Sequence, residues 1–346
     1  MWVVSVMIRA VGMFSGGLDS VLAVKLMKDQ GIELDVLHYT LGFDSMKLER
    51  RAKKKALETT REALEAQLGV TIQDIDVTEE FLQVVLHPKY GYGSEMNPCI
   101  DCKVFLLRKA KEYMQTHQAQ FVFTGEVVGQ RPMSQQRQTL LQIEKAAGLS
   151  GCLLRPLSAK LLEPTIAEQH GWVDREKLLG IGGRGRSGQL ALAKTFKLSY
   201  HQPAGGCLLN DPQFSIRFRD LIAHKVKEQI STDDSALLKF GRHLRLSDTL
   251  KVIVGRHEVD NEFLEQYSRG RWTAELRDIP GPLVVIDGEP NPEDFELIGK
   301  IAAAYSKAKG AERALIDFKK HNESHSIAIV PDRLLDPNQW RIRCLS

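Results

Sequence analysis

Residues 8–20 read Ile-Arg-Ala-Val-Gly-Met-Phe-Ser-Gly-Gly-Leu-Asp-Ser, an apolar run followed by a short loop that contains two adjacent glycines. The run Ile8–Phe14 predicts a buried β-strand, and the spacing of the apolar residues in Ser20–Gln30 predicts a helix. Glycines let backbone N–H groups approach a phosphate closely, and a helix N-terminus favours an anion. The loop Ser15–Ser20 therefore predicts a nucleotide site between a strand and a helix.

Further strands and helices alternate after this loop. The expected strands are Ile8–Phe14, Leu34–His38, Thr71–Val77 and Phe121–Thr124, and the expected helices are Ser20–Gln30, Leu48–Leu68 and Cys102–Thr116. Such alternation indicates an α/β fold with a parallel sheet. Ligands of open α/β sheets bind beyond the carboxyl ends of the strands, so we expect the Ser15 loop, the turn after His38 and the turn Thr124–Glu126 to share one cleft. We also expect the loop Gly182–Gly188 to lie near it.

Length and composition indicate two domains. A chain of 346 residues exceeds what one hydrophobic core usually organises, and a hydrophobic content of 43% supplies enough residues for two. We expect a nucleotide-binding domain at residues 1–230 and a smaller domain at 246–346. No apolar run approaches the ~20 residues that span a bilayer, so we expect a cytoplasmic protein with no membrane contact. The net charge of +3 is too mild to indicate nucleic acid binding by itself.

The glycine loop differs from two common nucleotide motifs. A P-loop needs a Lys before its final Ser, and a dinucleotide fingerprint needs Gly-x-Gly-x-x-Gly. The string Ser15-Gly16-Gly17-Leu18-Asp19-Ser20 instead resembles the PP-loop ATP pyrophosphatases, whose HUP-like domain adenylates a substrate and releases pyrophosphate. The resemblance implies that ATP and Mg²⁺ bind here. The residues that it implies for the pyrophosphate part of ATP are Ser15, Gly16, Gly17, Asp19 and Ser20.

The cysteines supply a second group of candidate residues. Cys99 and Cys102 lie at an expected helix start with i, i+3 spacing, which places both sulfurs on one face, and the helix dipole there favours thiolates. Cys207 follows Gly205 and Gly206, which allow close approach of a cluster, a substrate or another cysteine. A Cys-x-x-Cys pair alone is often zinc-binding or redox-active. A third cysteine in a glycine turn adds the option of a three-thiolate iron–sulfur site with one open iron.

Two families of RNA-modifying enzymes share these motifs. The string Asn97-Pro98-Cys99-x-x-Cys102-Lys103 after a PP-loop resembles the tRNA 2-thiouridylases. Thr124-Gly125-Glu126-x-x-Gly129-Gln130, followed by Ser134-Gln135 and Arg155-Pro156-Leu157, is similar to the tRNA 4-thiouridine synthetases. Both families thiolate uridine through an adenylated base, so the resemblance implies an ATP-dependent tRNA sulfurtransferase. It also implies that the ATP cleft is lined by Lys103, Gly125, Glu126 and Gln130.

The resemblance leaves two routes for sulfur. Many 2-thiouridylases carry an Asp in the place of Cys99, and the Cys found here favours a [4Fe–4S] cluster on Cys99, Cys102 and Cys207. The alternative is a persulfide on Cys207 that Cys102 resolves, without a cluster. Sulfide or a cysteine desulfurase would supply the sulfur. Position C2 or C4 of the uridine stays open, and a homodimer is compatible with either route.

Two other functions fit part of the sequence. A PP-loop ligase that adenylates a carboxylate of a small molecule would use the same loop, but it leaves the three cysteines unexplained. A nucleotide-regulated RNA-binding protein without turnover would use the loop as a sensor. Pyrophosphate release on addition of tRNA and sulfide separates these functions.

The last hundred residues carry a third resemblance. Val254-Gly255-Arg256-His257, Arg277-Asp278-Ile279-Pro280-Gly281-Pro282 and Ala304-Tyr305-Ser306-Lys307-Ala308-Lys309 resemble the RNA-binding domain of NFACT proteins, which implies a smaller α+β domain that contacts tRNA. The cations available for phosphates are Arg256, His257, Arg277, Lys307 and Lys309. Trp272 and Tyr305 are either stacking faces for bases or members of the core.

Overall fold

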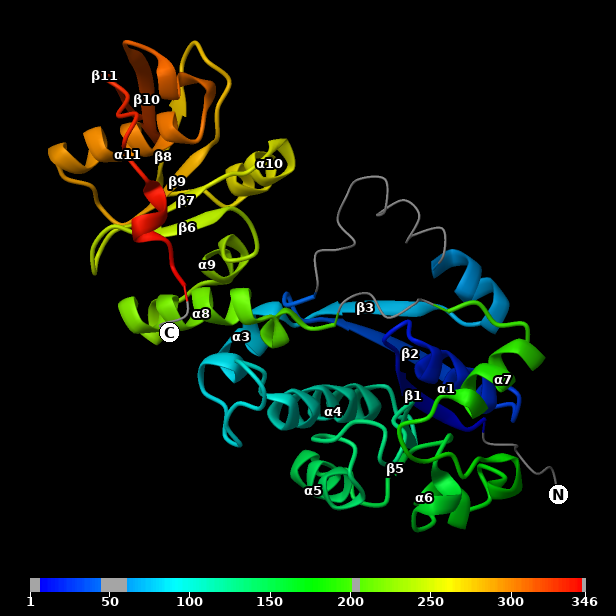
Figure 1. Cartoon of the computed structure of the whole chain (residues 1–346). Helices are drawn as coiled ribbons and strands as arrows, with labels where there is room; N and C mark the ends of the chain where they lie inside the picture. Colours follow the sequence, from blue (N-terminus) through cyan, green and yellow to red (C-terminus); the bar gives the residue numbers. More distant parts are fainter. Residues whose placement is uncertain (1–6, 45–60, 201–205, 344–346) are drawn as a thin grey trace. The chain divides into compact units, whose positions relative to one another are not determined.

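The computed structural model describes residues 7–44, 61–200 and 206–343. It divides into two compact units, Met1–Cys207 and Leu208–Ser346 (Figure 1). The sequence-based boundary lies later, with domains at 1–230 and 246–346. The segment between these two boundaries includes helix α8 (Pro212–His224), which the structure assigns to the C-terminal unit.

The N-terminal unit is built on a five-stranded parallel sheet in the order β3-β2-β1-β4-β5. Its strands are β1 (Arg9–Met13), β2 (Glu33–Thr40), β3 (Ile72–Asp76), β4 (Phe121–Thr124) and β5 (Leu153–Leu154). In the register, Ala10 of β1 lies opposite Leu34 on one side and Phe121 on the other. The four expected strands and the parallel α/β fold are confirmed. Because chain order reverses between β1 and β4, the loops that follow these two strands meet at the switch point where such folds bind ligands.

Helices cover both faces of this sheet (Figure 1). Alternate residues of β1 point to opposite faces, so Ala10 joins the core under α1 and α7 while Val11 joins the core under α4 and α5. The expected helix Leu48–Leu68 is helical over its described part, residues 61–68, and the rest lies outside the described residues. The unit also contains helices α1 (Leu18–Lys28), α3 (Thr78–Leu86), α4 (Cys99–Thr116), α5 (Arg137–Ala147), α6 (Ile166–Gln169) and α7 (Ser187–Thr195), with short 3₁₀ turns η2 (Ala159–Leu161) and η3 (Arg175–Lys177).

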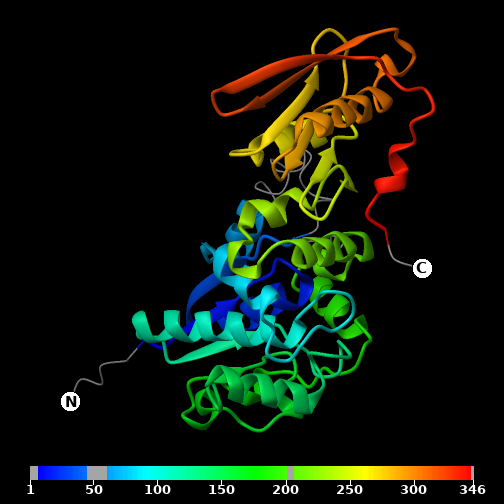
Figure 2. The same ribbon diagram turned by 90° about the vertical axis from the view of Figure 1, so that its left-hand side faces the viewer.

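The C-terminal unit contains a six-stranded antiparallel sheet in the order β11-β10-β8-β9-β7-β6 (Figure 2). The strands are β6 (Arg242–Arg245), β7 (Lys251–Val254), β8 (Trp272–Leu276), β9 (Val284–Asp287), β10 (Ala314–Lys320) and β11 (Glu323–Ile329). The remaining elements are η4 (Leu208–Asn210), α8, η5 (Lys227–Gln229), α9 (Thr232–Leu237), α10 (Glu258–Gln266), α11 (Pro292–Ala304), η6 (Lys307–Gly310) and η7 (Pro337–Trp340). This unit is the expected α+β domain.

Both faces of the antiparallel sheet are buried near its centre. Val252 and Val254 pack in the core that includes α11, whereas Ile253, between them, packs with Leu264 of α10. This alternation explains why β7 reads as a continuous apolar run. Among the described residues, no helix is long and apolar enough to cross a membrane.

Candidate functional site

The Ser15 loop connects β1 to α1 in a conformation that depends on its glycines. Gly16 has a φ of +72°, a left-handed conformation that other residues rarely adopt. Gly17 is the N-cap of α1 and has no side chain to cap the helix, so the first-turn N–H groups remain available to an anion. The Ser20 hydroxyl donates to the Gly17 carbonyl at 2.8 Å and accepts from the Ser15 N–H at 3.3 Å. The loop therefore has the form of a phosphate cradle.

The loop after β4 lies directly against this cradle. A Cβ on Gly125 would stand 2.5 Å from the backbone carbonyl of Asp19, so only glycine permits this approach. The Gln130 side-chain amide donates to Asp19 Oδ2 at 3.1 Å. The other carboxylate oxygen, Asp19 Oδ1, and Gln130 Oε1 are buried without a hydrogen-bond partner among the described residues. The structure thus brings Gly125 and Gln130 to the PP-loop, as the shared-cleft interpretation requires.

Glu126 continues the site as a buried carboxylate held by two cations. Its Oε1 lies 3.2 Å from Lys103 Nζ, and its Oε2 lies 3.3 Å from Arg155 Nε. The side chains of Arg155 and Glu126 are 1% and 4% exposed. Burial raises the pKa of Glu126, but the charges of Lys103 and Arg155 outweigh it and hold that pKa below its usual value. Glu126 is therefore ionised at neutral pH.

Lys103 connects this carboxylate to the cysteines, because it follows Cys102 in the first turns of α4. The helix begins at Cys99, three residues earlier than expected, so both cysteines lie within it. Cys207 pairs with Asp44 in an isolated antiparallel bridge, which places the turn of Cys207 beside the residues that follow β2. All three cysteines are half-buried and form no disulfide.

The expected stabilisation of thiolates at the start of α4 is wrong. Burial raises the pKa of the Cys102 thiol to about 12, with further increases from Cys207, Cys99 and Asp44, and the charge of Lys103 does not offset this rise. Burial also raises the pKa of Cys99. Desolvation disfavours the charged form of a buried thiol. Without a metal, the Cys99 and Cys102 thiols are protonated at neutral pH.

The three thiols are neighbours, but they are not preassembled around one metal ion. Cys99 and Cys207 lie close enough to Cys102 to affect its pKa. Within residues 7–44, 61–200 and 206–343, no group of three His, Cys, Asp or Glu side chains is arranged to hold a metal ion.

Arg155 is a site residue to which the sequence interpretation gave no role, although it opens the motif Arg155-Pro156-Leu157. Its guanidinium also donates to Glu144 Oε2 of α5 at 2.8 Å. The motif Arg155-Pro156-Leu157, directly after β5, was the sequence feature that could have identified Arg155 as a site residue. The loop Gly182–Gly188 also lies near the site, because the Gly183 N–H donates to the Val128 carbonyl at 2.8 Å, just after Glu126.

The residues expected to contact RNA have different surroundings. Trp272 is 8% exposed and packs edge-on against Phe295, so it belongs to the core. Arg277 forms a bidentate ion pair with Asp317, with Nε 3.1 Å and Nη2 2.5 Å from the two carboxylate oxygens. Arg256 pairs with the buried Asp260. Lys307 and Lys309 lie in η6 and His257 caps α10.

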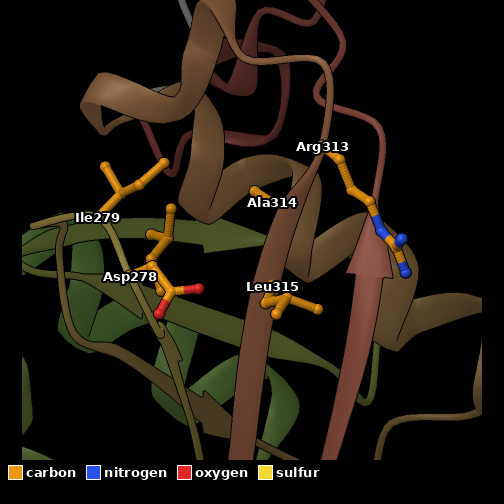
Figure 3. Close-up of a pocket in the computed structure, with 6 residues that line it drawn as sticks. Asp278, Ile279, Arg313, Ala314 and Leu315 are labelled. Atoms are coloured by element: carbon orange, nitrogen blue, oxygen red, sulfur yellow. The ribbon is translucent and has the colours of Figure 1, made fainter.

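A cavity of about 340 Å³ lies beside the end of β8 and the start of β10 in the same unit. Its lining is apolar at Leu276, Ile279, Ala314 and Leu315 and charged at Asp278 and Arg313. Figure 3 shows the Asp278 carboxylate on the loop after β8, directed toward β10. One carboxylate and one guanidinium give this lining no excess of positive charge for a phosphate.

Family comparisons agree with this division of the chain. Residues 8–153 match the family described as tRNA methyl transferase HUP domain, and residues 241–341 match the NFACT protein RNA binding domain. The first match lies within the N-terminal unit and the second within the C-terminal unit. The HUP-like and NFACT-type resemblances drawn from the sequence motifs are confirmed at the level of domains.

Individual relatives of the chain are tRNA-thiolating proteins by name. The chain is 31% identical over 100 residues to the tRNA-specific 2-thiouridylase MnmA of Thermotoga petrophila, which covers 27% of this chain and 28% of that protein. It is 27% identical over 149 residues to the tRNA sulfurtransferase of Desulfurococcus amylolyticus, covering 43% and 29%. The chain thus spans less than a third of the length of either relative.

A solved structure of a 4-thiouridine synthetase–RNA complex with bound ATP is 23% identical, with a TM-score of 0.31, and the match covers 40% of this chain and 34% of that one. The fold assignment accordingly rests on the sheet topology and the domain matches.

Proposed function

We propose that this chain is an ATP-dependent tRNA sulfurtransferase that adenylates a uridine carbonyl and replaces its oxygen with sulfur. One observation carries the proposal: the first turns of α4 present Cys99 and Cys102 together with Lys103, and Lys103 pairs with Glu126 on the loop that touches the PP-loop. We therefore assign the nucleotide cradle and the thiols to one site. The tRNA-thiolating relatives support tRNA as the substrate.

The residues present fit ATP and Mg²⁺. The positive φ of Gly16 and the uncapped start of α1 leave backbone N–H groups for the phosphates, with the hydroxyls of Ser15 and Ser20 beside them. The unpartnered Asp19 Oδ1 is a hard oxygen ligand of the kind Mg²⁺ prefers. Mg²⁺ bound there would offset charge on the phosphates during attack at the α-phosphorus.

Activation of the base precedes sulfur transfer. The uridine carbonyl oxygen attacks the α-phosphorus of ATP, a P–O bond forms, and the bond to pyrophosphate breaks. Lys103, whose ammonium lies beside Glu126, would place positive charge near the phosphates. Hydrosulfide then attacks the activated ring carbon, the C–O bond breaks, AMP leaves with the oxygen, and the proton of hydrosulfide passes to solvent.

The thiols would hold sulfur for the second step, and we prefer the version with a [4Fe–4S] cluster on Cys99, Cys102 and Cys207. A cluster held by three thiolates would supply an open iron that binds sulfide. The Cys at position 99 favours this version, because many 2-thiouridylases carry an Asp in that place. Either route would use Cys102 as a thiolate, so its raised pKa does not separate the two routes.

The test is pyrophosphate release by the full chain under anaerobic conditions with ATP, sulfide and an unmodified tRNA transcript. Release that requires tRNA supports the proposal. Release without tRNA but with a small carboxylate would indicate a ligase, and no release would leave a nucleotide-regulated RNA-binding protein. Each of these two outcomes would overturn the proposal.

The two sulfur routes are separated by iron and acid-labile sulfide analysis of the anaerobically purified protein. We expect stoichiometric iron in the wild type and its loss in Cys207→Ser. Cys152→Ser is the matched control, because Cys152 is a half-buried free thiol in the core under α4 and α5. An iron-free but active wild type would overturn the cluster route and leave the persulfide route standing, with a cysteine desulfurase as the source of persulfide sulfur.

A further inference from the structure

Four arginines of the C-terminal unit gather around β6 from separate segments. Arg242 lies on β6, Arg217 on α8, Arg256 just after β7, and Arg341 just after η7. The chain end reaches this strand because Leu244 of β6 forms an isolated antiparallel bridge with Arg341. Arg217 precedes the region that matches the NFACT-type domain, so the cluster combines that domain with α8.

These guanidinium groups lie close enough to affect one another. Burial, followed by the charges of Arg256 and Arg341, lowers the pKa of Arg217 to about 10. The guanidinium of Arg242 lies 4.6 Å from the ring centroid of Tyr305. Arg242 and Arg341 both act on the pKa of Tyr305, which burial raises and these two charges lower. Like charges gathered in this way repel one another.

Carboxylates compensate only part of this charge. Arg256 Nε lies 2.7 Å from Oδ2 of the buried Asp260. Among the described residues, no carboxylate oxygen lies within ion-pair distance of the other three guanidinium groups. The charge of Asp211 raises the pKa of Arg217, and the charge of Asp336 raises the pKa of the neighbouring Tyr305. Each of these carboxylates also accepts a backbone N–H at the start of its own helix. The cluster keeps an excess of positive charge.

Two of the arginines are held by backbone carbonyls instead of by acids. Arg217 donates to the Leu238 carbonyl at 2.8 Å, and Arg242 donates to the Gly255 carbonyl at 3.3 Å. A guanidinium has five N–H donors, so each arginine retains donors for a ligand. Arg256 and Arg341 are exposed, and Arg242 is partly exposed. The donors can therefore be reached from solvent.

We propose that this arginine cluster binds the phosphate backbone of RNA. Guanidinium forks match phosphate oxygens in pairs, and successive backbone phosphates match several arginines on one surface. Such contacts position an RNA without reading its sequence. The choice of RNA as the ligand rests on the tRNA substrate of the proposed function. The cavity beside Asp278 is a poorer phosphate site, because its one guanidinium, Arg313, is matched by one carboxylate.

The test measures binding of an unmodified tRNA transcript to the full chain at several KCl concentrations, without ATP. For the double variant Arg242→Gln/Arg341→Gln we expect about tenfold weaker binding and a slope of log K against log[KCl] that is smaller by about two. Arg269→Gln is the matched control, since Arg269 is exposed in the same unit and its neighbour Gly270 lies near His321 in the β10–β11 turn. Unchanged binding in the double variant, or an equal loss in the control, would overturn the proposal.

Two further measurements separate a phosphate site from other causes of weaker tRNA binding. Arg242→Lys/Arg341→Lys preserves both charges, so we expect it to retain most of the salt slope; a loss as large as that of the Gln variant would contradict a phosphate site. Calorimetry with inorganic phosphate tests whether the cluster binds the free ion. If the wild type binds phosphate tightly and the variants bind tRNA as well as the wild type, the ligand of the cluster is free phosphate and not RNA. Because no arm requires turnover, failure of thiolation and failure of this proposal are distinguishable.

Discussion

The charges around the PP-loop of the N-terminal unit are matched internally, whereas the arginines around β6 of the C-terminal unit outnumber the carboxylates near them. Glu126 has Lys103 and Arg155 as partners, and Arg155 has Glu144 as well. Around β6, Asp260 alone forms an ion pair with the cluster among the described residues. A matched, buried network holds side chains in place for chemistry, while an excess of one sign favours binding of a polyanion. The comparison predicts different consequences for mutations in the two units.

The largest expected effect in the N-terminal unit comes from Asp19→Ala. This change removes the half-buried carboxylate that we assign to Mg²⁺, so tRNA-dependent pyrophosphate release should fall by about 100-fold or more. Binding of tRNA should not change, because the arginine cluster is intact. Pyrophosphate release within a few fold of the wild type would remove Asp19 from the mechanism.

The second effect concerns stability of the matched network. Glu126→Gln leaves Lys103 and one side of Arg155 without their counter-charge, so we expect the free energy of unfolding of the N-terminal unit to fall by about 3 kcal/mol at neutral pH. Glu163→Gln is the control, because that side chain is 88% exposed and its ion pair with Arg137 should contribute little. An equal loss in both variants would show that burial of the pair has no special effect.

The pH dependence of this difference follows from the lowered pKa of Glu126. A carboxyl whose pKa is depressed by folding adds stability above its unfolded pKa, near 4.5, and this stability is lost as the pH falls through the folded value. The wild type and Glu126→Gln should therefore converge in stability as the pH falls below 4.5. Chemical unfolding at a series of pH values measures this, and a constant difference down to acid pH would contradict the ion-pair account.

A smaller effect is expected from Gly125→Ala. The added Cβ would stand 2.5 Å from the Asp19 carbonyl group, so the loop after β4 must move away from α1. We expect a cost of about 1–3 kcal/mol and weaker ATP binding, measured by calorimetry. Gly185→Ala is the matched control, because a Cβ added there would meet no atom within 4 Å. Equal ATP affinity in both variants would show that this close approach does not shape the nucleotide site.

The parts of the fold that were predictable from sequence depend on local chemistry. Alternation and glycine placement identified β4 at Phe121–Thr124 and the cradle at Ser15–Ser20, because strand propensity and loop geometry are encoded by neighbouring residues. The pairing of Arg155 with Glu126 and Glu144 could not be predicted, since it joins segments that only the folded sheet brings together.

Burial explains the predictions that failed or stayed open. The helix start at Cys99 and Cys102 was predictable, but the raised pKa of these two thiols was not, because desolvation depends on what the fold packs around them. Burial also decided between the two roles considered for Trp272, a stacking face for bases or a core residue, in favour of the core. Of the arginine cluster, only Arg256 was among the expected phosphate contacts. The grouping was hidden, since its members come from α8, β6, the end of β7 and the segment after η7, which lie far apart in the sequence.

The central claim is that the PP-loop and the thiols act in succession on one tRNA base. The most direct measurement quantifies pyrophosphate and thiouridine in the same anaerobic reaction, with ATP, sulfide and tRNA, for the wild type, Cys207→Ala and the control Cys152→Ala. The account predicts both products for the wild type and the control, and no thiouridine for Cys207→Ala although it still binds ATP. Thiouridine formation by Cys207→Ala at the wild-type level, or none by the wild type, would contradict it.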